Sequence, residues 1–360
     1  MVALAAVALA GMDQKDELYK TVRIKNVEEI LKDFKVFTFE SNDPVHYQAG
    51  QYITLVDVSK GIEIRRSYSM TSTPGLDQDI SVGVKRIPNG FFSRLLIDHA
   101  KAGDKLLTSG AGGRFILPED MGAYSELFLF AAGSGITPIY SIIKQCLHFH
   151  PKLHITLVYS NHSETTSIFK SDLEQWSLQY KSRFSIEWLF SNSANLTSAR
   201  LHRDLLMHIV NHIAPSTYKN ALYYVCGPLS YMRMCTFVLQ EMNVHPENIR
   251  KENFLIAQPR PPVLLPPDKD LHTALIHFRG TNYSIPVHYP DSILQAAKKA
   301  AVALPYSCET GRCANCIARC IRGNIWLSHN EVLTEKEMAS GLTLTCVGHP
   351  VGGDVELVIE

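Results

Sequence analysis

The sequence predicts a multidomain protein in which an antiparallel β-barrel, an α/β domain with a parallel sheet and a small α+β domain follow one another. Three observations predict this order. Short runs rich in β-branched and aromatic residues, separated by Gly, Pro, Asn and Asp, fill residues 20–116. Apolar strands alternate with amphipathic helices from 125 to 257. Beyond a proline-rich stretch, residues 270–360 contain two strands, a helix, a loop with three cysteines and terminal strands.

The first part reads as six strands joined by turns, which is typical of a small antiparallel barrel. The expected strands are Thr21–Val27, Lys35–Phe39, Tyr52–Val58, Arg65–Met70, Ile80–Ile87 and Lys105–Ser109.

The second part alternates between strand and helix, which is typical of a parallel sheet with connecting helices. The expected strands are Leu127–Ala132, His154–Tyr159, Phe184–Phe190 and Ala221–Cys226. The expected helices are Ile136–Phe149, Ile168–Tyr180, Leu201–Ile213 and Tyr231–Met242.

A linker separates the third part from the rest of the chain. Gln258–Pro267 contains five prolines, which favour an extended, semi-rigid spacer. The strands Thr273–Phe278 and Tyr283–Val287 and the helix Ile293–Val302 follow it. We expect an N-terminal extension at 1–15, the barrel at 16–120, the α/β domain at 121–257, the linker at 258–268 and the last domain at 269–360.

The apolar start Met1–Gly11 has no basic residue before Lys15 and is shorter than the ~20 residues that span a bilayer. We interpret it as a start site assigned too early or an expression scar, and we expect no membrane insertion.

Composition excludes several classes of function. Lys plus Arg equals Asp plus Glu at 35 each, so no basic field is present to bind nucleic acid or an anionic membrane. Hydrophobic residues make up 46% of the chain, enough for real cores. The eight cysteines show no closely spaced pairs that indicate disulfides, which fits a reducing cytoplasm.

Four cysteines near the C-terminus carry the strongest signal. Cys308, Cys313 and Cys316 follow the pattern C-x4-C-x2-C, and Cys346 comes 29 intervening residues later. This is the ligand spacing of a plant-type [2Fe–2S] cluster. A zinc site or separate core thiols are the alternatives, but zinc sites usually pair one C-x2-C with a second C-x2-C or a pair of histidines, and no second pair exists here. Cys320 lies in an alternating run, and we expect it in a strand.

A second motif lies in the expected barrel, where Arg66, Ser67, Tyr68 and Ser69 follow R-x-Y-S. These residue types suit a flavin, because Arg66 can neutralise a diphosphate, Tyr68 offers a flat face to the ring system and Ser69 can hydrogen-bond its polar edge. An exposed strand with no ligand is the alternative.

Further candidates for flavin binding follow the R-x-Y-S motif along the chain. A strand end and its turn lead into a short helix whose N-terminal N–H groups can face a diphosphate, and a glycine-rich loop, Gly110–Phe115, follows. The candidate residues are Val84, Lys85, Gly90, Ser93, Gly112 and Gly113.

The first strand of the α/β part runs into the pattern G-x-G-x-x-P before a helix. Gly133 and Gly135 let the backbone approach a diphosphate, Thr137 can hydrogen-bond a ligand, and Pro138 starts the helix with its fixed φ. This predicts a nicotinamide-coenzyme site, although a glycine turn in a generic α/β domain gives the same pattern.

A later strand ends at Cys226-Gly227-Pro228. Strand ends at the carboxyl edge of a parallel sheet face the ligand crevice, so Cys226 is a candidate for nicotinamide contact. A core thiol is the alternative for this residue.

Together these motifs closely resemble the ferredoxin–NADP reductase superfamily with a C-terminal ferredoxin domain, over roughly residues 16–360, and in particular the reductase components of bacterial oxygenases. The resemblance implies a flavin barrel, a nucleotide domain and a β-grasp ferredoxin domain. It implies FAD rather than FMN, and it makes Phe254 the aromatic residue that covers the flavin opposite Tyr68.

The coenzyme preference stays open between NADH and NADPH. NADPH-preferring relatives often have Ser-Arg after a sheet strand, where this chain has Ser191-Asn192. Arg200 and His162 are possible substitutes for the missing guanidinium.

The predicted function is electron transfer from NAD(P)H through FAD and [2Fe–2S] to a terminal oxygenase. A flavin is needed because it accepts the two electrons of a hydride together and passes them on one at a time. A desaturase, a cytochrome P450 or another monooxygenase is an alternative acceptor, and a redox sensor or a zinc scaffold is an alternative function. His208 and His212, four apart on a predicted helix, are expected to be exposed rather than metal-bound.

Overall fold

The computed structural model describes residues 19–58, 63–254 and 265–359. The chain divides into two compact units. Unit 1 comprises the residues up to 111 together with 115–253, and unit 2 comprises 112–114 and the residues from 254 onward. The expected extension 1–15 and linker residues 258–264 lie outside the described residues. In the described part of the chain, no helix has both the length and the apolar character needed to cross a bilayer.

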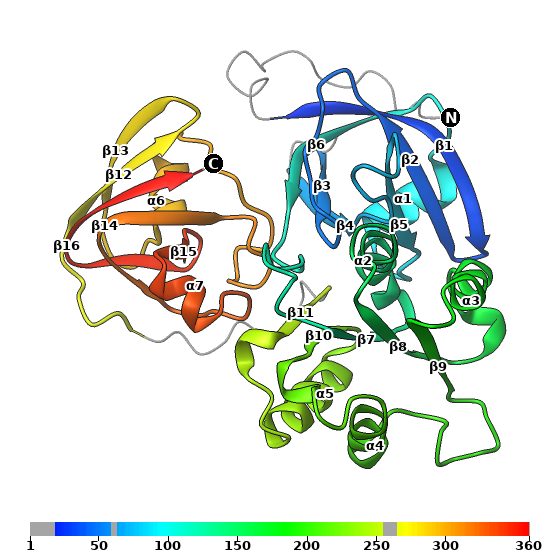
Figure 1. Cartoon of the computed structure of the whole chain (residues 1–360). Coiled ribbons are helices and arrows are strands. Elements are labelled where there is room, and N and C mark those ends of the chain that lie inside the picture. The colour runs from blue at the N-terminus through cyan, green and yellow to red at the C-terminus, as the bar shows by residue number, and fades with distance from the viewer. Residues whose placement is uncertain (1–18, 59–62, 255–264, 360) are drawn as a thin grey trace. The chain divides into compact units, whose positions relative to one another are not determined.

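Unit 1 begins with a six-stranded antiparallel barrel, drawn in blue to cyan in Figure 1. An antiparallel bridge between Met70 and Val82 connects the two ends of the sheet, whose strand order is β4-β3-β6-β1-β2-β5. Every second side chain of a strand points inward, so Val22, Ile24, Phe37 and others form an apolar core. The elements are β1 (Lys20–Leu31), β2 (Phe34–Glu40), β3 (Tyr52–Asp57), β4 (Ile64–Ser69), β5 (Ile80–Lys85), α1 (Phe91–His99) and β6 (Lys105–Gly112).

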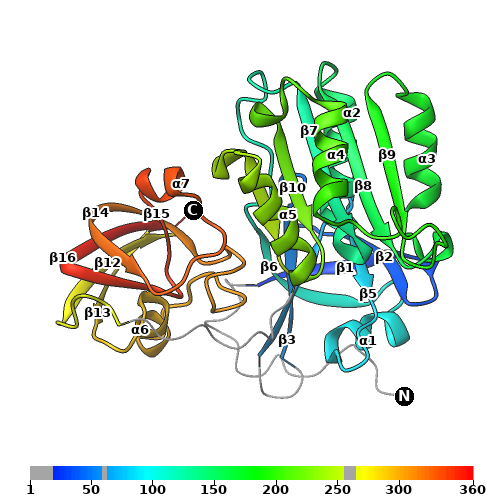
Figure 2. The ribbon, with the colours of Figure 1, turned by 90° about the horizontal axis from the view of Figure 1, so that it is seen from below.

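The rest of unit 1 is a five-stranded parallel sheet in the order β11-β10-β7-β8-β9, with strands side by side in Figure 2. The strands are β7 (Glu126–Ala132), β8 (His154–Asn161), β9 (Phe184–Phe190), β10 (Leu222–Cys226) and β11 (Ile249–Glu252). The helices are α2 (Ile136–Phe149), α3 (Lys170–Gln179), α4 (Arg203–Ile213) and α5 (Leu229–Glu241). Short 3-10 turns lie at η1 (Gly133–Gly135), η2 (Glu164–Thr166), η3 (Tyr218–Asn220) and η4 (Pro246–Asn248).

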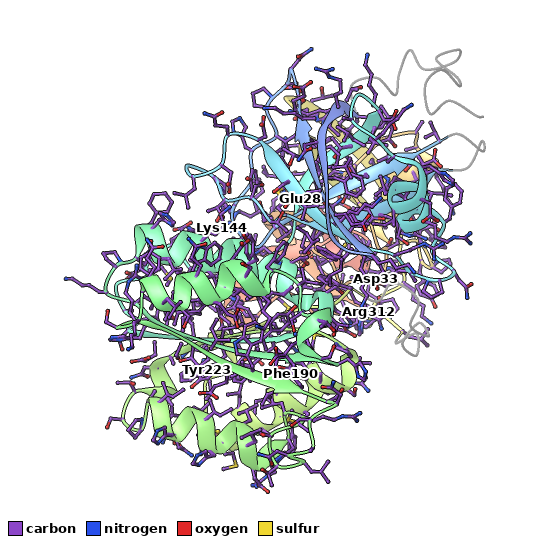
Figure 3. All side chains as sticks on the ribbon, turned by 90° about the vertical axis from the view of Figure 1, so that its right-hand side faces the viewer. Glu28, Asp33, Lys144, Phe190, Tyr223 and Arg312 are labelled. Atoms are coloured by element: carbon purple, nitrogen blue, oxygen red, sulfur yellow. The ribbon has the colours of Figure 1, made fainter. Side chains whose placement is uncertain are left out.

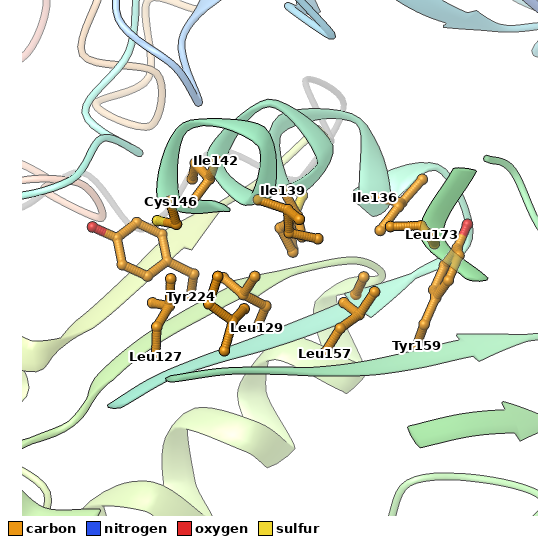
Figure 4. Close-up of a cluster of buried hydrophobic side chains, with 14 of the residues drawn as sticks. Leu127, Leu129, Ile136, Ile139, Ile142, Cys146, Leu157, Tyr159, Leu173 and Tyr224 are labelled. Carbon is orange, nitrogen blue, oxygen red and sulfur yellow. The ribbon is translucent and has the colours of Figure 1, made fainter. Parts of the chain in front are cut away.

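Helices cover both faces of this sheet, because its strands are apolar on both sides. On one face α2 packs over the strands, and Figure 4 shows its inward side chains above those of the sheet. The labelled residues there include Ile139, Ile142, Cys146, Leu127, Leu129 and Leu157. On the other face, Phe128, Phe130, Tyr223 and Val225 pack with residues of α4 and α5. The carboxyl ends of the strands are thereby held in fixed positions.

The barrel and the parallel sheet share buried contacts within unit 1. Thr73 Oγ1 donates a hydrogen bond to the Ser141 carbonyl at 3.0 Å, and Ser141 Oγ donates to the Ser72 carbonyl at 2.6 Å. Lys144 of α2, labelled in Figure 3, forms an ion pair with Asp77. These contacts set the barrel edge against the N-terminal half of α2.

Unit 2 is a β-grasp-type α+β fold with a mixed five-stranded sheet in the order β13-β12-β16-β14-β15. β12 and β16 pair in parallel, and the other described pairs are antiparallel. The elements are β12 (His272–Phe278), β13 (Thr281–Val287), α6 (Ile293–Lys299), β14 (Ile317–Leu327), α7 (Glu335–Ala339), β15 (Leu342–Leu344) and β16 (Gly348–Ile359). The fold class expected from the sequence is therefore confirmed.

Three local details differ from the sequence prediction. Strand β11 was not expected, because Ile249-Arg250-Lys251-Glu252 has little apolar character; pairing with β10 makes it a strand. The glycine-rich stretch is strand up to Gly112 rather than loop from Gly110. Pro138 does not start α2, which begins at Ile136 after a 3-10 turn. Pro138 lies in the first turn, where a backbone N–H has no helical acceptor to lose.

Candidate functional site

The R-x-Y-S motif lies on β4, at the edge of the barrel. Ser67 Oγ and Thr54 Oγ1 of β3 are 2.9 Å apart, and the Tyr68 ring lies 6.2 Å from the Phe92 ring of α1. Burial raises the pKa of Tyr68, so its phenol stays neutral. Arg66 is exposed, so its guanidinium can reach an anionic ligand.

Ser69, the last residue of β4, reaches a residue that the sequence analysis did not assign a role. Its Oγ donates a hydrogen bond to Glu252 Oε1 at 2.9 Å. The other carboxyl oxygen, Glu252 Oε2, is buried and has no hydrogen-bond partner among the described residues. Burial raises the pKa of Glu252 to about 8, although the Ser69 hydrogen bond acts in the opposite direction.

Cys226 lies directly beside Glu252, because β10 and β11 pair in parallel with these two residues in register. The thiol is fully buried, and burial raises its pKa. The edge of the sheet therefore presents a protonated thiol, a carboxyl group and a hydroxyl in one place. A carboxyl group that is neutral near pH 7 can both donate and accept a hydrogen bond.

The glycines next to this group make room for close backbone packing. A Cβ at Gly135 would lie 2.2 Å from the Cys226 carbonyl oxygen, and a Cβ at Gly227 would lie 2.9 Å from Ala132 Cβ. Gly133 has φ +55°. A Cβ at this position would meet no heavy atom within 4 Å, so open space adjoins this turn. Thr137 is buried, and its Oγ1 donates to the Ser134 carbonyl at 2.9 Å.

The predicted diphosphate-binding residues lie around α1 and the end of β6. Val84 and Lys85 end β5, with Val84 buried and Lys85 exposed. Gly90 is the N-cap of α1, and Ser93 Oγ accepts a hydrogen bond from the Ile87 N–H at 3.1 Å. Ser93 thus lies at the start of the expected helix, but its hydroxyl closes the preceding turn. Two glycines at the end of β6 were also predicted, Gly112 as its last residue and Gly113 with φ +107°.

Two further predicted residues have simple surroundings. Pro228 is the N-cap of α5 and turns the chain directly after Gly227. Phe254 is the last described residue before 255–264, and its side chain is 41% exposed. An exposed aromatic ring there is available to a ligand.

Unit 1 fits a bound flavin and nicotinamide on the evidence of its own atoms. The buried Glu252 Oε2 has no partner among the described residues, and the space beside Gly133 is open. Buried polar atoms normally have a hydrogen-bond partner, and a polar group of a bound ligand would supply one for Glu252 Oε2.

In unit 2, three of the four candidate ligands lie in the loop between α6 and β14, and Cys346 lies in the turn between β15 and β16. Positive φ angles at Glu309, Gly311 and Ala314 wind the loop tightly. A Cβ at Gly311 would lie 2.6 Å from the His329 carbonyl oxygen, so this position requires glycine.

A backbone contact aligns the distant fourth cysteine with the loop. The Thr345 N–H donates to the Cys316 carbonyl at 3.0 Å, and Thr345 Oγ1 donates to the same oxygen at 3.2 Å. Cys346 is therefore held next to Cys316.

The four thiols group two by two. A hydrogen bond that the Cys313 thiol donates lowers the pKa of Cys308 to about 5 and raises that of Cys313, and a hydrogen bond that the Cys346 thiol donates to Cys316 raises the pKa of Cys346. The Thr310 N–H also donates to Cys308 Sγ at 3.4 Å. Two pairs of thiols, with backbone N–H groups directed at sulfur, fit the donor set of a two-iron cluster.

Other metal-ligand candidates do not assemble a site. His208 and His212 are exposed on α4, with ring centroids 5.9 Å apart, as expected. Among the described residues, no three His, Cys, Asp or Glu side chains are arranged to hold one metal ion. Cys320 lies within β14, as the alternating pattern predicted.

The chain matches three family models in the predicted order. They are the oxidoreductase FAD-binding domain over residues 21–116, the oxidoreductase NAD-binding domain over 129–236 and the 2Fe-2S iron-sulfur cluster binding domain over 276–351. The protein is therefore an NAD(P)H-dependent oxidoreductase with an FAD-binding domain, an NAD-binding domain and a C-terminal [2Fe–2S] domain.

Its relatives include components of oxygenase systems. The chain is 29% identical over 347 residues to one subunit of the 1,2-phenylacetyl-CoA epoxidase of Escherichia coli K12, covering 94% of this chain and 96% of that protein. It is 28% identical to the ferredoxin reductase component of 3-ketosteroid-9-alpha-monooxygenase of Mycobacterium tuberculosis, covering 89% of each. The solved structure of phthalate dioxygenase reductase shares the fold, with a TM-score of 0.59 at 21% identity over 96% of this chain and 99% of that one.

Proposed function

We propose that this protein is the reductase component of an oxygenase system similar to the phenylacetyl-CoA epoxidase system. The observation that carries the proposal is the pairing of four thiols in unit 2, on the same chain as a flavin- and nicotinamide-type site in unit 1. The naming of several relatives as oxygenase reductase components supports it.

In this proposal, most of the residues that hold the coenzymes belong to unit 1. FAD, when bound, accepts a hydride from NAD(P)H and gives up the electrons one at a time. Tyr68 and Phe254 would flank its ring system, and Ser69 would hydrogen-bond the polar edge where the hydride arrives. Arg66 and the N-terminus of α1 near Ser93 would contact its diphosphate. The other residues proposed to bind the flavin are Ser67, Val84, Lys85, Gly90, Gly112 and Gly113.

The nicotinamide half is proposed to bind at the carboxyl edge of the parallel sheet. The residues proposed for it are Gly133, Gly135, Thr137, Pro138, Cys226, Gly227 and Pro228. Cys226 and Glu252 remain protonated there, so no buried negative charge opposes the arriving hydride. The packing around Gly135 keeps the Cys226 carbonyl in place.

In unit 2, Cys308 and Cys313 are proposed to ligate one iron, and Cys316 and Cys346 the other. The Thr310 N–H donates to Cys308 Sγ at 3.4 Å and would stabilise thiolate charge at this one ligand.

Two details of the proposed function are the identity of the electron acceptor and the preference for NADH or NADPH. We propose an oxygenase as acceptor, and a desaturase, a cytochrome P450 or another monooxygenase is the second candidate because the same centres suffice. A redox-sensing role is the third. His162, directly after β8, is a candidate coenzyme contact, and its Nδ1 lies 3.2 Å from Ser191 Oγ, directly after β9. We place the protein in the cytoplasm.

Substitution of one proposed cluster-ligand cysteine tests the path of the electrons. Cys346→Ser is expected to abolish NAD(P)H-dependent reduction of cytochrome c, because one iron loses a thiolate ligand. Reduction of ferricyanide should continue, since ferricyanide accepts electrons directly from a flavin. Cys320→Ser is the matched control, because this cysteine lies in the same unit but within β14. Equal loss in both variants, or retained iron in Cys346→Ser, would contradict the assignment.

The acceptor is tested separately by reconstitution. Adding a purified oxygenase component is expected to couple NAD(P)H oxidation to product formation. Slow NAD(P)H oxidation with every acceptor, including cytochrome c, would instead support the sensor.

A further inference from the structure

One side chain in the cysteine loop has a charge and a location that the ligand assignment does not explain. Arg312 lies between Gly311 and Cys313, and only 8% of it is exposed (labelled in Figure 3). An arginine is permanently charged, and moving it out of water is costly unless partners compensate. A buried arginine beside a metal-ligand cysteine therefore requires a local source of negative charge.

One such source is Glu331, which follows β14. Arg312 Nε donates to Glu331 Oε1 at 3.1 Å, and His329 Nε2 lies 2.9 Å from the same oxygen. Burial alone would raise the pKa of Glu331, but the charges and hydrogen bonds of Arg312 and His329 outweigh it and hold the pKa below its ordinary value. Glu331 is accordingly ionised and anchors one edge of the guanidinium.

The other edge of the guanidinium is not satisfied by the described part of the protein. Arg312 Nη1 is buried and has no hydrogen-bond partner among the residues that the structure describes. A guanidinium has five N–H donors, and Glu331 shares its contacted oxygen with His329. One carboxylate therefore leaves part of this buried positive charge uncompensated.

Arg312 belongs to the ligand loop itself, because Cys313 follows it directly and Cys308 lies four residues before it. A [2Fe–2S] cluster held by four thiolates is a net anion, and the electron that reduces it adds a further negative charge. Net charge near such a cluster is one of the factors that set its reduction potential. A buried cation acts more strongly than an exposed one because water screens it less.

We propose that Arg312, anchored by Glu331, is a residue that raises the reduction potential of the cluster by stabilising its reduced state. The inference rests on the proposed ligation by Cys308, Cys313, Cys316 and Cys346. One electron enters the cluster and no bond or proton changes place in this step. Arg312 thereby favours electron flow from the flavin to the cluster.

The test measures the cluster potential in the full chain loaded with FAD and cluster. Redox titration is followed by the electron paramagnetic resonance signal of the reduced cluster, which separates it from the flavin. Arg312→Met removes the buried charge and keeps the apolar stem, so the potential should shift downward. Glu331→Gln removes the counter-charge and leaves Arg312 charged, so the potential should shift upward.

Arg319→Met is the matched control. Arg319 lies on β14 of the same unit and is exposed, and its Nη1 donates to the Ser340 carbonyl at 2.8 Å. Removing it changes the net charge by the same amount as Arg312→Met, but solvent screening should leave the cluster potential close to that of the native protein.

Opposite shifts in the Arg312 and Glu331 variants are specific to an electrostatic role. If the Arg312–Glu331 pair only stabilises the fold, both variants should lose thermal stability, and their cluster potentials should shift in the same direction or not at all. That result would overturn the proposal. So would an equal shift in Arg319→Met. If Arg312→Met does not load the cluster, Arg312→Lys and Glu331→Gln decide: the lysine variant should titrate near the native potential and the glutamine variant above it.

The failure of the ligand assignment would look different. If iron and sulfide analysis found no cluster in the native chain, the proposed function would fall before any variant was titrated. A loaded native cluster with unshifted variants would refute the role of Arg312 alone.

Discussion

The edge of the sheet in unit 1 and the cysteine loop in unit 2 control protonation by different means. At the sheet edge, burial raises the pKa of Cys226 and brings that of Glu252 to about 8, so both groups stay neutral. In the loop, hydrogen bonds between thiols lower the pKa of Cys308 to about 5 and raise the pKa of Cys313 and Cys346. The first environment keeps both of its groups neutral, whereas the second divides its thiols into hydrogen-bond acceptors and protonated donors.

The two sites also differ in how the chain builds them. The loop ligands lie within nine residues of one another, and backbone turns arrange three of the four. The sheet edge instead brings Ser69 of β4, Cys226 of β10 and Glu252 of β11 together from distant parts of the sequence. A site built from strand ends depends on the packing of whole domains, and a site built from a loop depends on local backbone geometry.

The largest expected effect comes from adding one methyl group at either site. Gly135→Ala would place Cβ 2.2 Å from the Cys226 carbonyl oxygen, and Gly311→Ala would place it 2.6 Å from that of His329. Each should cost about 1–3 kcal/mol of stability through overpacking. Gly135→Ala should weaken nicotinamide binding and spare the cluster, whereas Gly311→Ala should reduce iron content and spare the flavin.

The controls are Gly103→Ala in unit 1 and Gly280→Ala in unit 2. Both glycines have positive φ but no heavy atom within 4 Å of a built Cβ, so only backbone strain of roughly 1 kcal/mol is expected. Coenzyme titration and iron analysis check all four variants. Loss of both functions in one variant would show that the two sites are not independent.

A smaller effect should appear in the pH dependence of unit 1. The pKa of Glu252 is higher in the folded protein than in the unfolded chain, so the folded state retains a proton that the unfolded state loses. Stability should therefore fall as the pH rises from about 4.5 to about 8. Glu252→Gln should remove this slope while preserving a neutral hydrogen-bonding side chain beside Ser69.

Denaturant unfolding of the FAD-loaded protein, followed by flavin release over this pH range, measures the slope. Glu187→Gln on β9 is the control, because Glu187 is exposed. A slope that persists in Glu252→Gln would mean that another group takes up the proton.

The smallest effect is expected in unit 2, and it has the opposite sign. Asp268 accepts hydrogen bonds from the N–H groups of Asp270 and Gly352 and contacts His272 Nε2 at 2.7 Å. These bonds lower its pKa to about 2. The stability that they contribute is present above pH 3.8 and should be lost as the pH falls toward 2.

Asp268→Asn should make the acid unfolding of unit 2 less dependent on pH in that window. Circular dichroism during acid titration checks this. An unchanged acid transition would show that other carboxylates dominate it.

The sequence by itself determined the order and class of the three folded parts, and it predicted the cluster ligands. Strand and helix periods are written into local residue patterns, and the C-x4-C-x2-C loop needs only short-range backbone geometry. The R-x-Y-S and G-x-G-x-x-P segments were also readable, because turns and glycines act locally.

Tertiary structure alone decided the partner of Ser69, the strand character of Ile249–Glu252 and the burial of Arg312. The physical reason is the same in each case. A charged residue near a strand end or in a loop looks solvent-exposed in a sequence pattern. Only long-range packing removes its water, raises the pKa of Glu252 and leaves Arg312 Nη1 without a partner among the described residues.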